Sequence, residues 1–247
     1  MTAIGPDLRT PASALAIAAH PDDVEFGCGA TLAKWAAAGC EVHHLVCTDG
    51  SKGTWDPGQD LADLVVQRRH EQREAAAALG ATGEVVFLDW PDGELGSGLR
   101  QRWQVAYWIR RLRPTVVLGH DPWRRYRLHP DHRHAGFLTV DAVVAARDPH
   151  FFPEQQLPHH RPEAVLLFEA DEADHVEAVT EADLARKLAA LEAHDSQMRS
   201  TMRVEAGTDD AATQLAAFHR RVRDRLTDHG ALAGVPLGEA FAAITDV

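Results

Sequence analysis

The amino-acid sequence predicts an α/β fold in which a parallel sheet lies between helices. Short apolar runs typical of strands alternate with alanine-rich stretches of helical length along most of the 247 residues. This alternation is the pattern of successive strand–helix–strand units. A chain of this length with 45% apolar residues can bury a sizeable core as one unit. We therefore expect a single domain over residues 1–247.

The first expected elements follow from apolar runs and from glycine. A strand is expected over residues 14–19, where apolar residues follow one another. A helix runs through residues 31–38 and ends at Gly39, because glycine readily adopts the left-handed conformation that closes helices. The second strand is expected over residues 42–48. Residues 49–60 are rich in glycine and long for a connection, so we interpret them as a functional loop.

The rest of the chain continues this alternation. A long helix over residues 61–79 is closed by Gly80. A helix over residues 99–112 stops before Pro114, because the residue before a proline avoids helical geometry. The remaining elements are predicted in the same way: strands at 85–88, 115–119 and 165–168, and helices at 134–146, 181–193 and 211–226.

The charge balance excludes two classes of partner. Asp and Glu total 37 against 25 Lys and Arg, which gives a formal net charge of −12 with histidine neutral. Nucleic-acid grooves and anionic membrane surfaces both require clustered positive charge, so we expect neither partner. No stretch approaches the ~18 consecutive apolar residues of a membrane span. Asp7 and Arg9 interrupt the N-terminal region, so we expect no export signal.

The cysteines indicate the compartment. Cys28, Cys40 and Cys47 lack CxxC spacing, and an odd number suits free thiols better than a disulfide framework. We therefore expect a cytoplasmic protein. The chain also contains 15 histidines, an unusual abundance that makes metal chemistry worth testing.

A histidine and two aspartates follow the first expected strand directly, in the run His20-Pro21-Asp22-Asp23. Ligands of open parallel sheets gather at the carboxyl ends of the strands, where this run lies. Pro21 stiffens the turn and orients its neighbours. Adjacent carboxylates and an imidazole at an apolar strand end need a cation or hydrogen-bond donors, and a divalent metal would satisfy them. The alternative is that Asp22 or Asp23 only caps the following helix.

A second histidine-rich run, HPDHRH at residues 129–134, follows the fourth expected strand. A lone histidine is more often an ordinary surface or core residue than a ligand. These two runs, however, follow strands at the same edge of a parallel sheet, so they can converge in space. Together they supply two imidazoles and a carboxylate, the ligand set of a catalytic zinc that keeps one position open for water.

These two runs resemble the motifs of the LmbE-like, or PIG-L-type, zinc deacetylases. The resemblance covers roughly residues 14–200 and includes shorter motifs at 27–32, 48–50, 68–71, 91–93 and 193–197. It implies a Rossmann-like, mostly parallel sheet flanked by helices, and hydrolysis of the N-acetyl group of a glucosamine-type substrate. Ala30 departs from the family pattern, which usually has glycine there. We expect that change to affect helix packing more than chemistry.

The resemblance implies that His20, Asp23 and His132 hold a Zn²⁺ ion, with another divalent metal such as Fe²⁺ as an alternative. The residues alone do not decide whether Asp22 or Asp23 is the ligand. A zinc ion with one anionic ligand keeps net positive charge and lowers the pKa of its bound water toward ~7.

The resemblance also assigns catalytic roles. Asp22 is expected to act as general base and then to protonate the departing amine. His129, when protonated, would stabilise the oxyanion of the tetrahedral intermediate. Asp131 would orient or stabilise a neighbouring imidazole. His194 and Gln197 match a later family motif that we interpret as structural or interfacial.

Substrate contacts are expected from three residues. Arg68 matches a family arginine directed at the polar end of the substrate, although an ion pair with Glu71 on the same helix is an equal alternative. Asp92 lies in a loop and could accept hydrogen bonds from sugar hydroxyls. Arg124, in the aromatic and basic run at 123–127, could bind an anionic substituent or simply lie on an exposed loop.

Two other function classes fit parts of the sequence. A non-catalytic, Rossmann-like nucleotide-binding protein fits Gly27-x-Gly29 before a helix with Asp49 after the second strand, but Leu32 occupies the position of the third glycine. A non-catalytic metal-binding protein would have a closed coordination shell. Among hydrolases, the same groups could cleave a larger amide of a glucosamine-containing thiol conjugate. The expected partner is a small amino-sugar substrate, and a homo-oligomer is compatible with the sequence.

Overall fold

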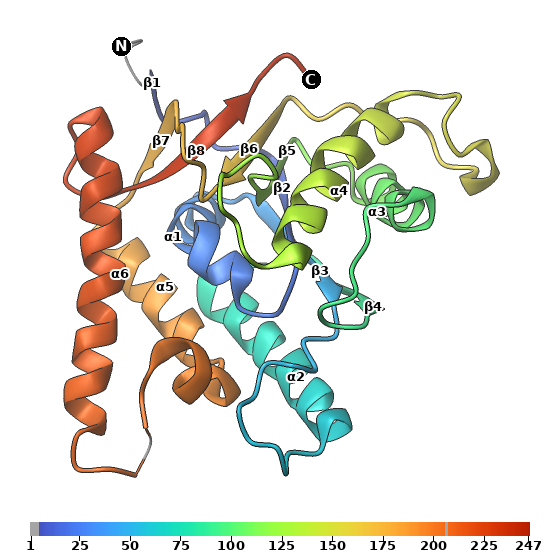
Figure 1. The fold of residues 1–247 in the computed structure, drawn as a ribbon. Helices are drawn as coiled ribbons and strands as arrows, with labels where there is room; N and C mark the ends of the chain where they lie inside the picture. The colour runs from blue at the N-terminus through green and yellow to red at the C-terminus, as the bar shows by residue number, and fades with distance from the viewer. Residues whose placement is uncertain (1–4, 206) are drawn as a thin grey trace.

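A computed structural model describes residues 5–205 and 207–247 of the chain. Within these ranges the strands form one eight-stranded sheet in the order β1-β7-β8-β6-β5-β2-β3-β4. Helices cover both faces of this sheet (Figure 1). The strand bounds are β1 Gly5–Pro6, β2 Ser13–Ala18, β3 Glu41–Thr48, β4 Val85–Trp90, β5 Val116–His120, β6 Ala164–Phe168, β7 His175–Ala178 and β8 Gly238–Ile244.

The predicted α/β class and the mostly parallel sheet are confirmed. Strands β2 to β6 pair in parallel with their neighbours, as does β1 with β7. Only β8 runs antiparallel, to β6 on one side and β7 on the other. The sequence predicted β2 to β6 and missed β1, β7 and β8. Strand β1 has only two residues, and β7 and β8 each carry a buried glutamate, Glu177 and Glu239 respectively.

The α-helices are α1 Asp23–Ala37, α2 Leu61–Leu79, α3 Leu99–Leu112, α4 Pro130–Arg147, α5 Glu181–Glu192 and α6 Ala211–Ala233, with short 3₁₀ or π turns at Pro153–Gln155, Asp195–Gln197 and Met198–Met202. Both α2 and α3 have their predicted bounds. The predicted helix at 134–146 begins earlier, because proline is favoured in the first turn of a helix and Pro130 takes that position. The second histidine run therefore lies in the first turn of α4.

The helices form layers on the two faces of the sheet (Figure 1). Helices α3 and α4 pack together on one face, over a core that contains Leu15, Ile17 and Val117. Helices α1, α2 and α5 cover the other face, over a core that contains Trp35, Leu118 and Phe168. Helix α6 packs outside α5 and against β7 and β8. In the described residues, no helix is both long and apolar enough to cross a membrane.

Helix α1 is interrupted at Cys28, whose φ of −146° is not helical. Glu239 of β8 satisfies the backbone of the second half of this helix. Its Oε1 accepts a hydrogen bond from the Ala30 N–H at 3.1 Å, and its Oε2 accepts one from the Thr31 N–H at 2.7 Å. Lys187 of α5 pairs with the same carboxylate at 2.5 Å. The last strand and α5 thus fix the helix that follows the first histidine run.

The carboxyl ends of β2, β5 and β6 lie side by side, because these strands are parallel neighbours in the sheet. Strand β2 leads into His20, β5 ends at His120, and β6 is followed by Glu169. The N-terminus of α4 approaches the same edge. This edge is where ligands bind in open parallel sheets.

Candidate active site

An open cavity of about 430 Å³ lies at this edge of the sheet. Seven of the nine site residues expected from the sequence line it: His20, Asp22, Asp23, Arg68, Asp92, His129 and His132. The remaining lining residues are Phe26, Lys52, Gly53, Gly93, Glu169, Gln197, Thr201 and Arg225. Asp131 is fully buried behind the wall, and Arg124 lies outside the cavity.

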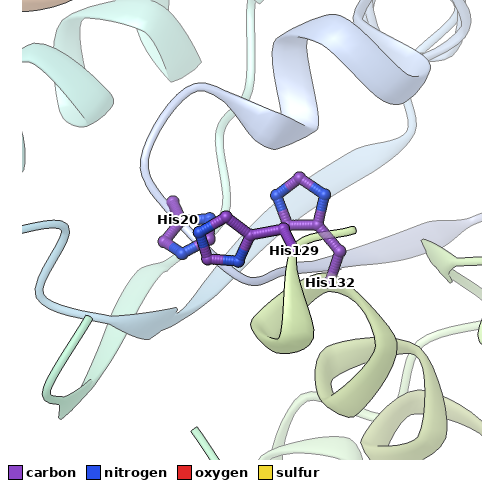
Figure 2. A group of neighbouring side chains, drawn as sticks. All are labelled: His20, His129 and His132. Carbon is purple, nitrogen blue, oxygen red and sulfur yellow. The ribbon is translucent and has the colours of Figure 1, made fainter. Parts of the chain in front are cut away.

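The two histidine runs converge as expected (Figure 2). His20 comes from the turn after β2, whereas His129 and His132 come from the start of α4. The ring centroids of His20 and His129 are 4.6 Å apart, and those of His20 and His132 are 5.2 Å apart. Three imidazoles from two distant parts of the chain therefore share one wall of the cavity.

Asp23 is placed between two of these imidazoles. Its Oδ2 lies 3.2 Å from Nδ1 of His20 and also accepts the backbone N–H of His20 at 2.8 Å. Its Oδ1 lies 3.3 Å from Nε2 of His132. Burial alone would raise the pKa of Asp23, but the charges of His132 and His120 hold it well below its usual value. Asp23 therefore remains an anion.

Asp131 holds His20 from the other side. Its Oδ2 lies 3.2 Å from Nε2 of His20, while its carboxylate accepts the backbone N–H groups of Gly93 at 2.6 Å and Leu95 at 3.2 Å. The neighbouring imidazole expected for Asp131 is therefore that of His20. Despite its burial, the pKa of His20 lies well above its usual value, because Asp131, Asp23 and Asp92 all accept hydrogen bonds from it.

Asp92 faces His20 and not only the open cavity. Its Oδ1 lies 3.2 Å from Nε2 of His20, and its Oδ2 accepts the Lys52 N–H at 3.0 Å. The loop position expected from the sequence is correct, since Asp92 lines the cavity. However, much of its hydrogen-bonding capacity is already used within the protein, which leaves less for sugar hydroxyls than the sequence indicated.

The donor groups of the site fit a divalent cation. Three overlapping sets of potential ligand atoms lie within 4.8 Å of one another in the described residues: His20, His129 and His132; Asp23, His120 and His132; and His20, Asp92 and Asp131. Metal–ligand distances of ~2.0–2.2 Å in a tetrahedral site imply ligand atoms about 3.3–3.6 Å apart. The 3.2 and 3.3 Å separations of Asp23 from His20 and His132 approach that range.

The expected ligand trio is not one of these compact sets. His20, Asp23 and His132 are distributed among them because the His20 ring directs Nε2 toward Asp92 and Asp131 and only Nδ1 toward Asp23. The buried carboxylates around these imidazoles nevertheless concentrate negative charge that a cation would neutralise.

Asp22 has an unusual backbone conformation at the start of α1. Its φ of 93° lies in the left-handed region, which a non-glycine residue rarely adopts, and its side chain does not cap the helix. The helix-cap alternative for Asp22 is therefore wrong. Burial raises the pKa of Asp22 to about 6, against the opposing charge of Arg68. Such a carboxyl can exchange a proton near neutral pH.

Arg68 is buried beneath the cavity floor. Its Nη1 donates to the Gly50 carbonyl at 2.8 Å and its Nη2 to the Pro21 carbonyl at 2.6 Å, while Nη2 lies 3.5 Å from the Asp22 carboxylate. The alternative ion pair with Glu71 is not formed, because the Glu71 carboxylate accepts hydrogen bonds from the N–H and hydroxyl of Ser196. Arg68 supports the turn that contains Pro21 and Asp22, and it also lines the cavity.

His129 is exposed at the cavity mouth. Burial of its ring atoms and the nearby His20 and His132 imidazoles lower its pKa. This shift opposes the protonated form that the sequence interpretation requires. A bound anion or oxyanion would have to favour that form.

Arg124 lies beside Glu169 and Asp171, with nitrogen–oxygen separations of 3.8 Å to each. Arg124 does not line the 430 Å³ cavity, but it lines an adjoining pocket together with His129, His132 and Glu169. Of the three expected substrate contacts, Arg68 and Asp92 line the cavity itself, and Arg124 lies in the adjoining pocket.

Three residues that contact the candidate ligands or one another at the site, His120, Arg127 and Glu169, were not expected from the sequence as site residues. His120 lies 3.3 Å from Asp23 through Nε2 and 3.6 Å from Glu169 through Nδ1. Arg127 donates to Glu169 at 2.5 Å and lies 3.2 Å from Nδ1 of His132. These contacts orient the imidazoles that face Asp23. His120 directly follows the strand predicted at 115–119, and Arg127 ends the aromatic and basic run at 123–127, so both had a signal in the sequence; Glu169 belongs to no motif.

The two glycines of the nucleotide-binding alternative have packing roles. A Cβ atom at Gly27 would lie 2.5 Å from the Phe168 ring, and one at Gly29 would contact Lys187 at 3.4 Å. Gly27 therefore lets α1 approach Phe168 closely, whereas the 3.4 Å contact at Gly29 is an ordinary van der Waals distance. Neither forms the tight phosphate-binding turn of a dinucleotide site.

Comparisons with known proteins identify a family. The model of the GlcNAc-PI de-N-acetylase family, PIG-L, matches residues 15–143. Diacetylchitobiose deacetylase of Thermococcus kodakarensis is 36% identical over 186 residues, which cover 74% of this chain and 69% of that protein. A 1D-myo-inositol 2-acetamido-2-deoxy-alpha-D-glucopyranoside deacetylase of Streptomyces avermitilis is 33% identical over 58% of this chain and 57% of its own length.

The fold also matches a solved structure. N,N'-diacetylchitobiose deacetylase of Pyrococcus horikoshii, in complex with its inhibitor MPG, superposes with a TM-score of 0.83 and 29% identity. The match covers 95% of this chain and 84% of that protein. The similarity therefore extends well beyond the segment that the family model matches.

Proposed function

Because this chain belongs to the PIG-L family of de-N-acetylases, we propose that it hydrolyses the N-acetyl group of an N-acetylglucosamine-type substrate with the help of a divalent metal, taken to be Zn²⁺. The chain is an N-deacetylase, that is, an amide hydrolase. The relatives' names specify diacetylchitobiose and a glucosaminyl inositol as their substrates, so a small amino-sugar glycoside is the proposed substrate class.

The observation that carries this proposal is the position of the Asp23 carboxylate between His20 and His132, beside Asp22 and open to the cavity. We assign His20, Asp23 and His132 as the residues that would hold the metal. When bound, the cation would polarise the amide carbonyl and make a water molecule more acidic. Fe²⁺ is the alternative metal, because imidazole and carboxylate ligands suit both ions.

Asp22 is the proposed general base. In the hydrolysis, water oxygen forms a bond to the acetyl carbon, the carbon–nitrogen bond breaks, and acetate and a free amine leave. The Asp22 carboxylate lines the cavity and takes the water proton, then returns it to the departing nitrogen. Arg68, 3.5 Å away, stabilises the anionic form of Asp22 before the proton arrives.

His129 and Asp131 assist in different ways. His129 is at the cavity mouth and is proposed to stabilise the negative charge that develops on the acetyl oxygen. Asp131 does not enter the cavity, and it holds His20 in one orientation through the 3.2 Å contact with Nε2. Asp131 is therefore a positioning residue.

Arg68 and Asp92 line the cavity floor and wall, and they are the proposed contacts for the polar end of the sugar. Arg124 is less suited to this role because its charge is directed at Glu169 and Asp171. The three cysteines are free and buried, which supports the reducing cytoplasm as the proposed compartment. One catalytic domain over residues 1–247 accounts for the sheet and both histidine runs.

The test is acetate release from a panel of N-acetylglucosaminyl compounds by the metal-loaded protein. The panel includes diacetylchitobiose, N-acetylglucosaminyl inositol, and a matching glucosamine–thiol conjugate with a larger acyl group. Release of acetate with zinc supports the proposal. Cleavage of the larger amide alone would replace N-deacetylation by the wider amidase function, and no cleavage of any compound would overturn the proposal.

A further inference from the structure

The peptide unit that joins Pro21 to Asp22 is held at both of its polar atoms by helix α2. Its carbonyl accepts a hydrogen bond from Nη2 of Arg68 at 2.6 Å, and its N–H donates to Oε1 of Gln72 at 3.0 Å. Arg68 and Gln72 are four residues apart, so they lie on the same face of the helix. One face of α2 therefore fixes the plane of a single peptide bond.

Glu25 and His44, on the side of Gln72 away from Asp22, orient its amide. Its Nε2 donates to Oε1 of Glu25 at 2.7 Å and lies 3.2 Å from Nδ1 of His44. Glu25 is also 3.3 Å from Nε2 of His194, and all four of these side chains are buried. Because a carboxylate only accepts hydrogen bonds, the amino end of Gln72 must face Glu25, which turns its oxygen toward Asp22.

Asp22 needs this support because of its backbone. A φ of 93° is costly for aspartate, and no hydrogen bond from its own side chain to the helix start compensates for it. The plane of the peptide before Asp22 sets the direction of the Cα–Cβ bond. Rotation of that plane would move the carboxylate within the cavity.

We infer that Gln72 is a positioning residue for catalysis: it fixes the Pro21–Asp22 peptide, and through it the direction of the Asp22 carboxylate, while Glu25 fixes Gln72. This inference rests on the proposed role of Asp22 as general base. Gln72 does not line the cavity, so it acts only through Asp22. Loss of its two hydrogen bonds should reduce turnover much more than substrate binding.

The experiment compares Gln72→Met with Gln67→Met in the zinc-loaded full chain. Gln67 is on the same helix and exposed, and its amide donates to Glu71 at 2.9 Å rather than to the Pro21–Asp22 turn, which makes it a matched control. We measure kcat and KM for acetate release from diacetylchitobiose, bound zinc, and Tm. We expect Gln72→Met to lower kcat by about tenfold to 100-fold with KM within about twofold and full zinc, as for other residues that orient catalytic groups.

A conservative pair tests the orientation argument and replaces Gln72→Met if that variant does not fold. Gln72→Glu keeps an acceptor for the Asp22 N–H but places a second carboxylate against Glu25. The double variant Glu25→Gln/Gln72→Glu reverses the donor and acceptor and restores the pairing. We expect the single variant to be slow and the double variant to recover most of the lost kcat.

Three outcomes would overturn the inference. The first is a kcat of Gln72→Met equal to that of the wild type. The second is a fall in kcat that is fully explained by a smaller amount of bound zinc or of folded protein. The third is a double variant no faster than Gln72→Glu alone. Asp22→Asn is assayed in parallel: if it keeps full turnover, the general-base assignment fails and the inference with it. If Asp22→Asn is inactive but Gln72→Met is not, the inference alone fails.

Discussion

Oδ1 of Asp23 lies 3.3 Å from Nε2 of His132, although the two residues belong to different helices on opposite faces of the sheet. Asp23 begins α1 and His132 lies in the first turn of α4, so two helix N-termini meet at the carboxyl edge of the parallel strands. The partial positive charge of helix N-termini favours anions there. Both the Asp23 carboxylate and the oxyanion of the reaction would benefit from this arrangement.

Asp22→Asn should separate proton transfer from metal binding. The amide keeps the size of the side chain but cannot take a proton from water, so we expect acetate release to fall by about 100-fold or more. Bound zinc should remain stoichiometric, because Asp22 is not an assigned ligand. Parallel assays of acetate and metal content check this expectation, and full activity in the variant would refute the assigned role.

Asp23→Ala and His132→Ala should lose the metal. Partners that only orient ligands change metal affinity by about 10–100-fold, so removal of a direct ligand should cost at least about 100-fold. Zinc titration with a competing chelator measures the affinity. His134→Ala is the control, since His134 is on the same helix but bonds to Ser97 outside the cavity. Equal zinc affinity in all three variants would contradict the ligand assignment.

Arg68→Ala should reduce stability and turnover, whereas Arg124→Ala should leave stability and KM nearly unchanged. Removal of the buried Arg68 leaves the Gly50 and Pro21 carbonyls without their donor, which we expect to cost about 1–3 kcal/mol of stability and to slow turnover. Arg124 is on the rim, so its removal should leave stability unchanged and change KM by no more than about twofold. Urea unfolding and steady-state kinetics measure both effects. A large rise in KM for Arg124→Ala would bring this residue back as a substrate contact.

Acid should destabilise the protein through Glu177. Burial alone would raise the pKa of Glu177, but hydrogen bonds from His175, Lys34 and the Leu8 N–H lower it below its ordinary value of 4.5. The folded state therefore binds this proton less readily than the unfolded state does. The resulting stabilisation is complete above the unfolded pKa and is lost as pH falls through the folded pKa.

Glu177→Gln tests the direction of this pH dependence of stability. The substitution should lower the free energy of unfolding at pH 7. The difference between the unfolding free energies of variant and wild type should become smaller as the pH falls from about 5 to 3. Urea unfolding at each pH measures both. Glu177 lies on β7, away from the cavity, so kcat should not change at pH 7. A difference from wild type that is independent of pH would show that Glu177 contributes through packing only.

The sequence predicted the parts of the molecule that depend on local pattern. Unbroken apolar runs revealed β2 to β6, and glycine or proline marked the ends of α2 and α3. The two histidine runs were recognisable because their residues are close together in the chain. Their convergence followed from the rule that parallel strands share one carboxyl edge.

The parts that were missed depend on contacts between distant residues. Glu177 and Glu239 interrupt the apolar pattern of β7 and β8, and they are buried because distant groups pair with them: Lys34 and the Leu8 N–H with Glu177, and Lys187 with the Ala30 and Thr31 N–H groups for Glu239. The contacts of Glu169 with His120 and Arg127 arise only when β5, β6 and the loop before α4 are assembled. The hydrogen bond from the Asp22 N–H to Gln72 likewise joins two elements that no local pattern connects.

The hydrogen bonds from the Ala30 and Thr31 N–H groups of α1 to Glu239 have a consequence for biosynthesis. Ala30, which follows the His20–Asp23 turn, is translated 209 residues before Glu239 of β8. Until β8 has been synthesised, the Ala30 and Thr31 N–H groups lack their acceptor and Lys187 lacks its counter-ion. The enzyme should therefore acquire its activity only after β8 has been synthesised.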